Sequence, residues 1–208
     1  MKKHSKRNLT YAMALGRSMT AVMDPPSANE ATTPANLQTA LGVESHAHAR
    51  YLEFAKEADE EGYAPVASLF RAAARAEEIH LGNLREVLNG LGLPSAENSD
   101  PVVVKSTFEN LHAAIRDEVY ERDEMYPSFL FQARSEGNRA AARAFHLAQT
   151  AESEHADLFS QSLRELERLR GDALVHHVCP VCGLTLADAD RSRCTVCSTP
   201  IDQFEKVS

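Results

Sequence analysis

Two Glu-x-x-His motifs stand out among the residues that could do chemistry: Glu77 and His80 in "RAEEIH", and Glu152 and His155 in "AESEH". Residues three apart on a helix face the same way, so each motif would present a carboxylate beside an imidazole. Each motif lies on an apolar stripe of its predicted helix, where an unpaired charge is costly. A single copy of such a motif is common on solvated helix faces. Two copies suggest metal binding, because both side chains are metal ligands.

The motifs belong to an internal repeat. The stretch "NLQTALGVE" (36–44) resembles "NLHAAIRDE" (110–118) at an offset of 74, and residues 61–80 resemble residues 136–155 at an offset of 75. Each half is predicted to be a helix pair, with one Glu on its first helix (Glu44 or Glu118) and Glu-x-x-His on its second. The change of offset by one residue predicts a bulge in the third helix near "MYP" (125–127), since π-bulges are frequent at functional sites.

These residue types match a known ligand set. One Glu from each of two helices, together with Glu-x-x-His from each of the other two, binds two iron or manganese ions in carboxylate bundles. Converging carboxylates without cations repel and must take up protons, a cost that two divalent ions remove. We therefore predict a dinuclear metal site with these ligands: Glu44, Glu77, His80, Glu118, Glu152 and His155.

Several nearby residues are candidates for the same site or for ordinary packing. Glu121, three residues after Glu118, shares its helix face, and its counterpart in the first repeat is near Ala47. Tyr51 follows Glu44 by two helical turns and could reach a ligand carboxylate. His48 is expected beside the ligands or exposed. The other histidines are assigned to surface, tail or linker positions: His4, His46, His112, His146, His176 and His177.

The four cysteines form two Cys-x-x-Cys pairs near the C-terminus: Cys179, Cys182, Cys194 and Cys197. In a protein without a signal peptide this pattern favours metal binding over disulfides. A tetrathiolate site accepts zinc, which would be structural, or iron, which would transfer single electrons. A segment of about 35 residues is too small to fold without its metal.

The elements that must position these residues are four helices, predicted at 36–61, 64–91, 106–135 and 138–170. The connections around Gly62 and Gly137 are tight. About 14 residues join the second and third helices, which is long enough to cross the bundle and leave these helices parallel. One long crossover indicates a ferritin-like all-α bundle. We expect a flexible extension at 1–33, the bundle at 34–171, and a small four-cysteine metal-binding domain at 172–208.

Net charge and the lengths of the apolar runs argue against several functions. The net charge of −8 argues against a nucleic-acid partner. No apolar run approaches the ~20 residues needed to span a membrane, and the basic first 20 residues lack a secretory apolar core. A cytoplasmic protein is expected.

The chain resembles rubrerythrins over residues 36–208. The family pattern is a Glu followed seven residues later by Tyr (Glu44, Tyr51), two Glu-x-x-His motifs, and Glu-x-x-Glu followed by Met-Tyr-Pro, which fits "EVYERDEMYP" (118–127). A late aromatic, Phe204, follows the cysteine pairs. The cysteine segment also departs from the family, because it has Leu184 in place of an aromatic residue and "CTVC" in place of Cys-Pro-x-Cys. These departures weaken the prediction of iron in the module and strengthen zinc as the alternative.

The resemblance implies a di-iron peroxidase that reduces hydrogen peroxide to water. Glu77 and Glu152 would bridge two iron ions, Glu44 and Glu118 would be terminal ligands, and Glu121 and His80 would exchange on one iron. Tyr51 and Tyr126 would hydrogen-bond ligand carboxylates. Iron in the cysteine module would relay electrons from an external donor, such as an NAD(P)H-dependent reductase or a rubredoxin. The resemblance further implies a homodimer in which each module lies near the partner's di-iron site.

Two other functions fit the same residues. A ferroxidase or iron-handling protein would use the same bundle. A non-catalytic protein would use the cysteine module as a structural zinc knuckle that recruits a partner.

Overall fold

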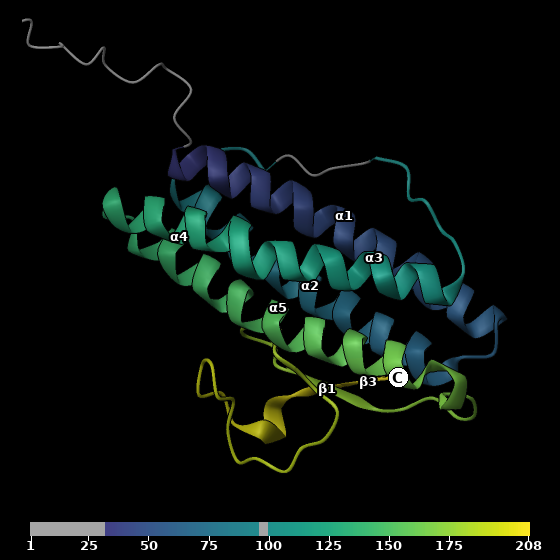
Figure 1. Ribbon diagram of the computed structural model, residues 1–208. Helices are drawn as coiled ribbons and strands as arrows, with labels where there is room; N and C mark the ends of the chain where they lie inside the picture. The colour runs from purple at the N-terminus through teal and green to yellow at the C-terminus, as the bar shows by residue number, and fades with distance from the viewer. Residues whose placement is uncertain (1–31, 96–99) are drawn as a thin grey trace, which may run out of the picture. The chain divides into compact units, whose positions relative to one another are not determined.

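The first two helices form a hairpin around Gly62 in the computed structural model, which describes residues 32–95 and 100–208 (Figure 1). Helix α1 (Thr33–Glu60) is capped by Thr32, whose hydroxyl accepts from the Ala35 N–H. Helix α2 (Ala64–Gly90) has Pro65 in its first turn. Gly62 adopts φ +80°, which lets the chain reverse between the helices. The predicted extension lies, up to residue 31, outside the described residues.

The second pair of helices contains an interruption. Helix α3 (Thr107–Tyr120) passes into a π-helical turn, η1 (Glu121–Met125), and continues as α4 (Tyr126–Ser135) before α5 (Arg139–Glu165) returns. Ser106 and Glu109 form a capping box at the start of α3. A 3-10 turn, η2 (Leu166–Arg168), ends the bundle. The helices predicted from sequence are confirmed, and so is the bulge near residue 125.

The connection between α2 and α3 crosses the length of the bundle. At one end, the Gln38 side-chain amide of α1 donates to the Pro94 carbonyl oxygen just after α2. At the other end, the Thr107 N–H donates to Glu61 Oε2 at 2.9 Å. The starts of α2 and α3 therefore lie at the same end, and these helices are parallel. This arrangement confirms the predicted ferritin-like topology with one long crossover.

The two largest apolar clusters lie in the bundle, one toward each end. One cluster centres on aromatic rings from α1, α2 and α5, with Tyr51, Phe70 and Phe159 buried together. The other centres on Tyr126 and Phe145 of the second helix pair. Burial of such rings supplies much of the stability of the fold. The predicted metal ligands belong to neither cluster.

The cysteine module is a three-stranded antiparallel sheet with the order β2-β1-β3, made of β1 (His176–Val178), β2 (Thr185–Leu186) and β3 (Glu205–Val207). A 3-10 turn, η3 (Ile201–Gln203), precedes β3. His176 is only 4% exposed, so its assignment to a surface or linker position was wrong. Strand β1 packs against α2 through Val178, where two small residues, Ala72 and Ala76, let the sheet approach.

Polar contacts hold the module on α2. Arg75 forms a bidentate ion pair with Glu205 at 2.6 and 2.9 Å. The Asn83 amide donates to the Val181 carbonyl oxygen at 3.0 Å. The module therefore lies on the bundle of its own chain, and its predicted position near a partner subunit's site stays a prediction. Residues from 32 onward form one compact unit, and the division into domains at 34–171 and 172–208 stays a prediction.

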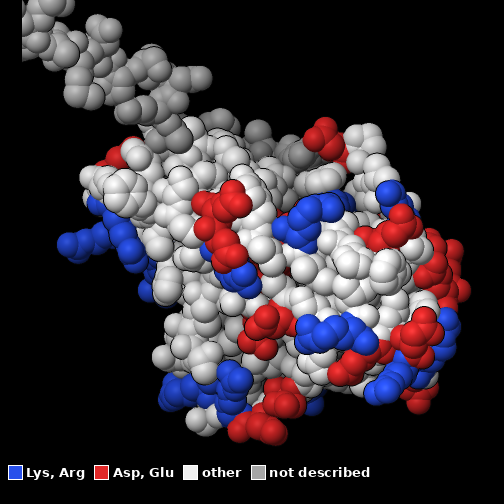
Figure 2. All heavy atoms as spheres, viewed as in Figure 1, with Lys and Arg blue, Asp and Glu red and all other residues white. Residues whose placement is uncertain are grey.

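The surface carries charges of both signs. On the face shown in Figure 2, lysine and arginine side chains alternate with aspartate and glutamate, and no large basic area is visible. Among the described residues, no helix is long and apolar enough to cross a membrane.

Candidate dinuclear metal site and four-cysteine site

The six predicted ligands converge at the centre of the bundle, between the two apolar clusters. They form two groups of four, and in each group the ligand atoms lie within 4.8 Å of one another. Glu77 and Glu152 belong to both groups, which is the position that bridging carboxylates require. The first group adds Glu44 and His80, and the second adds Glu118 and His155. All six side chains are buried.

The π-helical turn explains why the repeat changes its offset. Tyr51 follows Glu44 by seven residues, whereas Tyr126 follows Glu118 by eight. The extra residue falls within η1, where the Tyr126 N–H bonds to the carbonyl oxygen of Glu121. The turn also brings Glu121 to the inner face of the helix, where it is 4% exposed.

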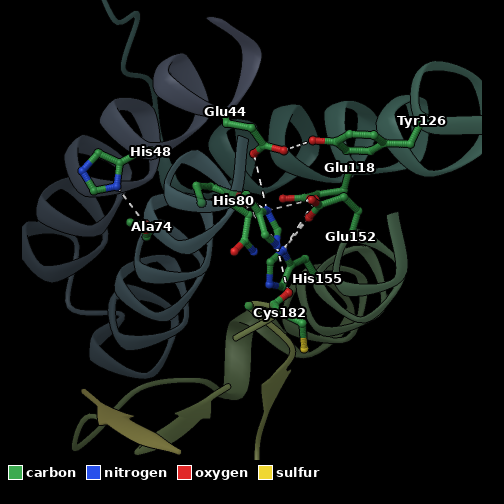
Figure 3. A network of polar contacts seen from close by, with 12 residues as sticks. Glu44, His48, Ala74, His80, Glu118, Tyr126, Glu152, His155 and Cys182 are labelled. Carbon is green, nitrogen blue, oxygen red and sulfur yellow. Dashed lines mark hydrogen bonds and ion pairs between the residues drawn. The ribbon is translucent and has the colours of Figure 1, made fainter. Parts of the chain in front are cut away.

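The two buried tyrosines contact the site across the repeat. Tyr51 of α1 donates to Glu118 Oε1 of α3 at 2.5 Å. Tyr126 of α4 donates to Glu44 Oε1 of α1 (Figure 3). Each tyrosine thus orients the carboxylate of the opposite half, as the family resemblance implied for ligand carboxylates.

The two imidazoles direct their Nδ1 atoms at the carboxylates. His80 Nδ1 lies 2.9 Å from Glu77 Oε2 and 3.1 Å from Glu152 Oε1. His155 Nδ1 lies 2.9 Å from Glu152 Oε2. His80 Nε2 lies 3.1 Å from the Cys182 carbonyl oxygen, which can only accept, so this nitrogen carries a hydrogen (Figure 3). Nδ1 then needs a proton or a metal ion between itself and the carboxylates.

The donor set fits two metal ions. Glu44 Oε2 and Glu152 Oε1 are buried without a hydrogen-bond donor, although such oxygens are normally paired. Both oxygens belong to the group around His80. Carboxylates and imidazoles in these numbers are the ligands of di-iron and di-manganese bundles. These residues would hold the two ions of the predicted di-iron cofactor.

Without metal, the site must retain protons. Burial raises the pKa of Glu118 to about 8, and the charge of Glu152 adds to this shift. Burial, and then the other carboxylates, raise the pKa of Glu77 and of Glu121 well above the ordinary value. Burial alone would lower the pKa of His80 and of His155, but the surrounding carboxylates raise both. Metal ions would displace these protons.

Glu121 belongs to neither ligand group. It lines a pocket of about 420 Å³ between α1 and α3 that is open to the surface. Val43, Ala47 and Tyr120 give this pocket an apolar lining. Ala47 of α1, the repeat counterpart of Glu121, lines the same pocket as the carboxylate-bearing Glu121 of η1.

The four cysteines form the second site. Their sulfur atoms lie within 4.8 Å of one another, with 3.4 Å between Cys179 and Cys197 and 3.5 Å between Cys182 and Cys194. All four are free thiols, and the N–H groups of Val196 and Cys197 point at Cys194 Sγ. A hydrogen bond with Cys182 lowers the pKa of Cys179 to about 5. This arrangement suits a tetrahedral metal ion.

Sequence reasoning missed two residues that join the sites. Gly183 adopts φ +76°, and a Cβ atom there would lie 2.5 Å from His80 Nε2. Thr185 Oγ1 lies 3.1 Å from His155 Nε2. The glycine of the Cys-x-x-Cys-Gly motif indicates a tight turn. No sequence pattern predicts that Gly183 or Thr185 contacts a histidine. His48 faces away from the site and contacts the Ala74 carbonyl oxygen at 2.8 Å (Figure 3).

The fold and the two sites define a ferritin-like carboxylate bundle for two metal ions, joined to a rubredoxin-like four-cysteine module. The sequence model of the rubrerythrin family matches residues 35–163. The chain belongs to the rubrerythrin family.

Individual relatives agree with this assignment. Nigerythrin of Nitratidesulfovibrio vulgaris is 37% identical over 176 residues, covering 83% of this chain and 85% of that protein. Rubrerythrin-2 of Clostridium acetobutylicum is 35% identical over 182 residues, covering 86% and 98%. A solved structure of fully reduced nigerythrin superposes with a TM-score of 0.79 at 34% identity, covering 89% of this chain and 91% of that one. The bacterioferritin of Desulfovibrio desulfuricans shares the fold, with a TM-score of 0.61 at 22% identity over 66% and 81%.

Proposed function

We propose that this protein is a non-haem di-iron peroxidase that reduces hydrogen peroxide to water in oxidative-stress defence. The observation that carries the proposal is the position of His80. Its Nδ1 faces the bundle carboxylates, and its Nε2 contacts the Cys182 carbonyl oxygen at 3.1 Å. A single imidazole thus joins the two metal sites, which favours electron transfer between them.

The chemistry requires two electrons and two protons for each peroxide. Two iron ions held by the bundle ligands would supply the electrons that break the O–O bond, and two water molecules would leave. The four-cysteine site, loaded with iron, would return electrons singly through Cys182 and His80. An external donor, such as an NAD(P)H-dependent reductase or a rubredoxin, would reduce the module.

Glu121 is the residue best placed to meet peroxide. Glu121 lines the pocket that opens between α1 and α3, and burial raises the pKa of its carboxyl group in the metal-free site. When Glu121 is not bound to iron, its carboxyl group would supply a proton to a peroxide oxygen. Glu121 and His80 would be alternative ligands of one iron ion. Tyr51 and Tyr126 hold Glu118 and Glu44 in place.

Stopped-flow mixing of the reduced protein with hydrogen peroxide or with oxygen tests the proposal. We expect peroxide to react much faster than oxygen, and a Glu121→Ala variant to lose turnover while retaining two iron ions. Equal rates with peroxide and oxygen would favour the ferroxidase alternative. Turnover that persists in the variant would remove Glu121 from the mechanism, and its absence in both proteins would favour the non-catalytic alternative.

The metal in the module decides whether the protein relays its own electrons. Elemental analysis after expression with iron and zinc should find about three iron ions per chain, two in the bundle and one in the module. Two iron ions and one zinc ion would make the module structural. The proposal includes a cytoplasmic location and a homodimeric state. Size-exclusion chromatography with light scattering would test the homodimer.

A further inference from the structure

The cysteine module contacts the second imidazole of the bundle as well as the first. Thr185 of β2 is fully buried, and its Oγ1 lies 3.1 Å from His155 Nε2. The two contacts mirror each other, since Cys182 and Thr185 reach the Nε2 atoms of His80 and His155 from one short segment of the module.

The direction of the second hydrogen bond follows from the partners of the hydroxyl. Thr185 Oγ1 also lies 3.1 Å from the Gly183 carbonyl oxygen. A carbonyl can only accept, and a hydroxyl has one hydrogen, so Thr185 donates to Gly183. Its remaining lone pairs then accept from the Nε2–H of His155. This places the hydrogen of the imidazole on Nε2 and leaves Nδ1 to face Glu152.

We propose that Thr185 is a positioning residue of the dinuclear site: it fixes the tautomer and ring orientation of His155 so that Nδ1 is available to a metal ion. The inference rests on His155 being a ligand, as the proposed function requires. The module then completes the bundle site in addition to binding its own metal. Such partners of metal-bound imidazoles typically change metal affinity by 10–100-fold.

The hydrogen-bond acceptor of His155 can be removed by mutation, whereas that of His80 cannot. The acceptor for His80 is a backbone carbonyl, which no substitution removes, whereas the acceptor for His155 is a side-chain hydroxyl. Thr185→Val keeps the shape but leaves the buried Nε2–H unpaired. Thr185→Ser restores a hydroxyl. Thr150→Val is a matched control, because the Thr150 hydroxyl bonds only to the His146 carbonyl oxygen on the surface of α5.

The test uses Co²⁺ titrated into the metal-free full chain. Thiolate charge-transfer bands report the four-cysteine site, and d–d bands of oxygen and nitrogen coordination report the bundle. We expect Thr185→Val to weaken Co²⁺ binding in the bundle by about 10–100-fold and to leave the cysteine site unchanged. Thr185→Ser should recover most of the affinity, and Thr150→Val should match the wild type.

A second readout begins with the wild type. Proton NMR of the Co²⁺-loaded wild type should show two shifted, exchangeable imidazole N–H signals that are both protected from water. Where Thr185→Val also binds Co²⁺, it should expose one of them. A single protected signal in the wild type would overturn the proposal, as would equal bundle affinity in Thr185→Val. Peroxide turnover is measured separately, so its absence would overturn the proposed function and leave this role of Thr185 intact.

Discussion

His80 Nε2 donates to the carbonyl oxygen of Cys182 at 3.1 Å, although the two residues are 102 positions apart. The contact is short because Gly183 follows Cys182 without a side chain. A Cβ atom on residue 183 would lie 2.5 Å from His80 Nε2 and 3.2 Å from the Ala76 carbonyl oxygen. The glycine therefore sets the separation of the two metal sites.

Gly183→Ala should move the first cysteine pair away from His80, because φ at this position is +76° and the methyl group has no room. We expect electron transfer from the four-cysteine site to the bundle to slow by about tenfold or more, equivalent to ~1.4 kcal/mol in activation free energy. Stopped-flow absorbance of the iron–thiolate bands after mixing with peroxide measures this rate.

Gly82→Ala is the control for this substitution, because a Cβ atom at Gly82 of α2 meets nothing within 4 Å. It should leave the rate unchanged and stabilise the helix by up to ~1 kcal/mol. An unchanged rate in Gly183→Ala would show that the His80–Cys182 contact does not carry the electron.

Tyr126→Phe should destabilise the protein, because Glu44 Oε1 loses its donor in a site where Glu44 Oε2 already has none. We expect a loss of about 1–3 kcal/mol in the free energy of unfolding. Urea unfolding of the metal-free protein gives the value. Tyr63→Phe is the control, since the Tyr63 hydroxyl only accepts from Arg170 at the surface. Equal losses in both variants would contradict a specific role for Tyr126.

The convergence of the six candidate ligands was predictable because each lies in a periodic helix and each half of the repeat supports the other. The π-helical turn was also visible in the sequence, because Tyr126 follows Glu118 by one residue more than Tyr51 follows Glu44. The fold followed from the same periodicity and from the length of the crossover.

Contacts of the cysteine module were not predictable. Gly183 and Thr185 act through histidines about 100 and 30 residues away, and no local pattern encodes such pairs. His176 was misplaced for a related reason: a histidine after a charged linker suggests exposure, but the sheet buries it. The position of the module on its own bundle depends on side-chain pairs such as Arg75 with Glu205, which are ordinary surface residues in the sequence.

Ala47→Phe should slow the reaction with peroxide, because Ala47 lines the pocket that leads to Glu121. We expect the second-order rate constant to fall by about tenfold, or ~1.4 kcal/mol, with an unchanged iron content. Ala49→Phe on the same helix does not line the pocket and should react like the wild type. If Ala47→Phe keeps the wild-type rate, peroxide enters by another path.

The stability of the metal-free bundle should fall as the pH rises from 5 to 8. The folded pKa of Glu118, about 8, exceeds its ordinary value of 4.5, so the folded state holds a proton that the unfolded state releases. The raised pKa values of His80 and His155 act in the same direction. The pKa of Glu152 is lowered instead, so Glu152 is ionised in both states over this range and adds no slope.

Urea unfolding of the metal-free protein, followed by the helical circular dichroism signal, should show a loss on the order of a few kcal/mol between these pH values. Glu118→Gln cannot ionise and should reduce the slope. In the metal-loaded protein, stability should instead rise with pH, because each ion displaces protons and binds more tightly as the pH rises. Calorimetry of Fe²⁺ binding under anaerobic conditions, in buffers of different ionisation enthalpy, should detect proton release. Binding without proton release would contradict the protonated carboxyl groups inferred for the metal-free site.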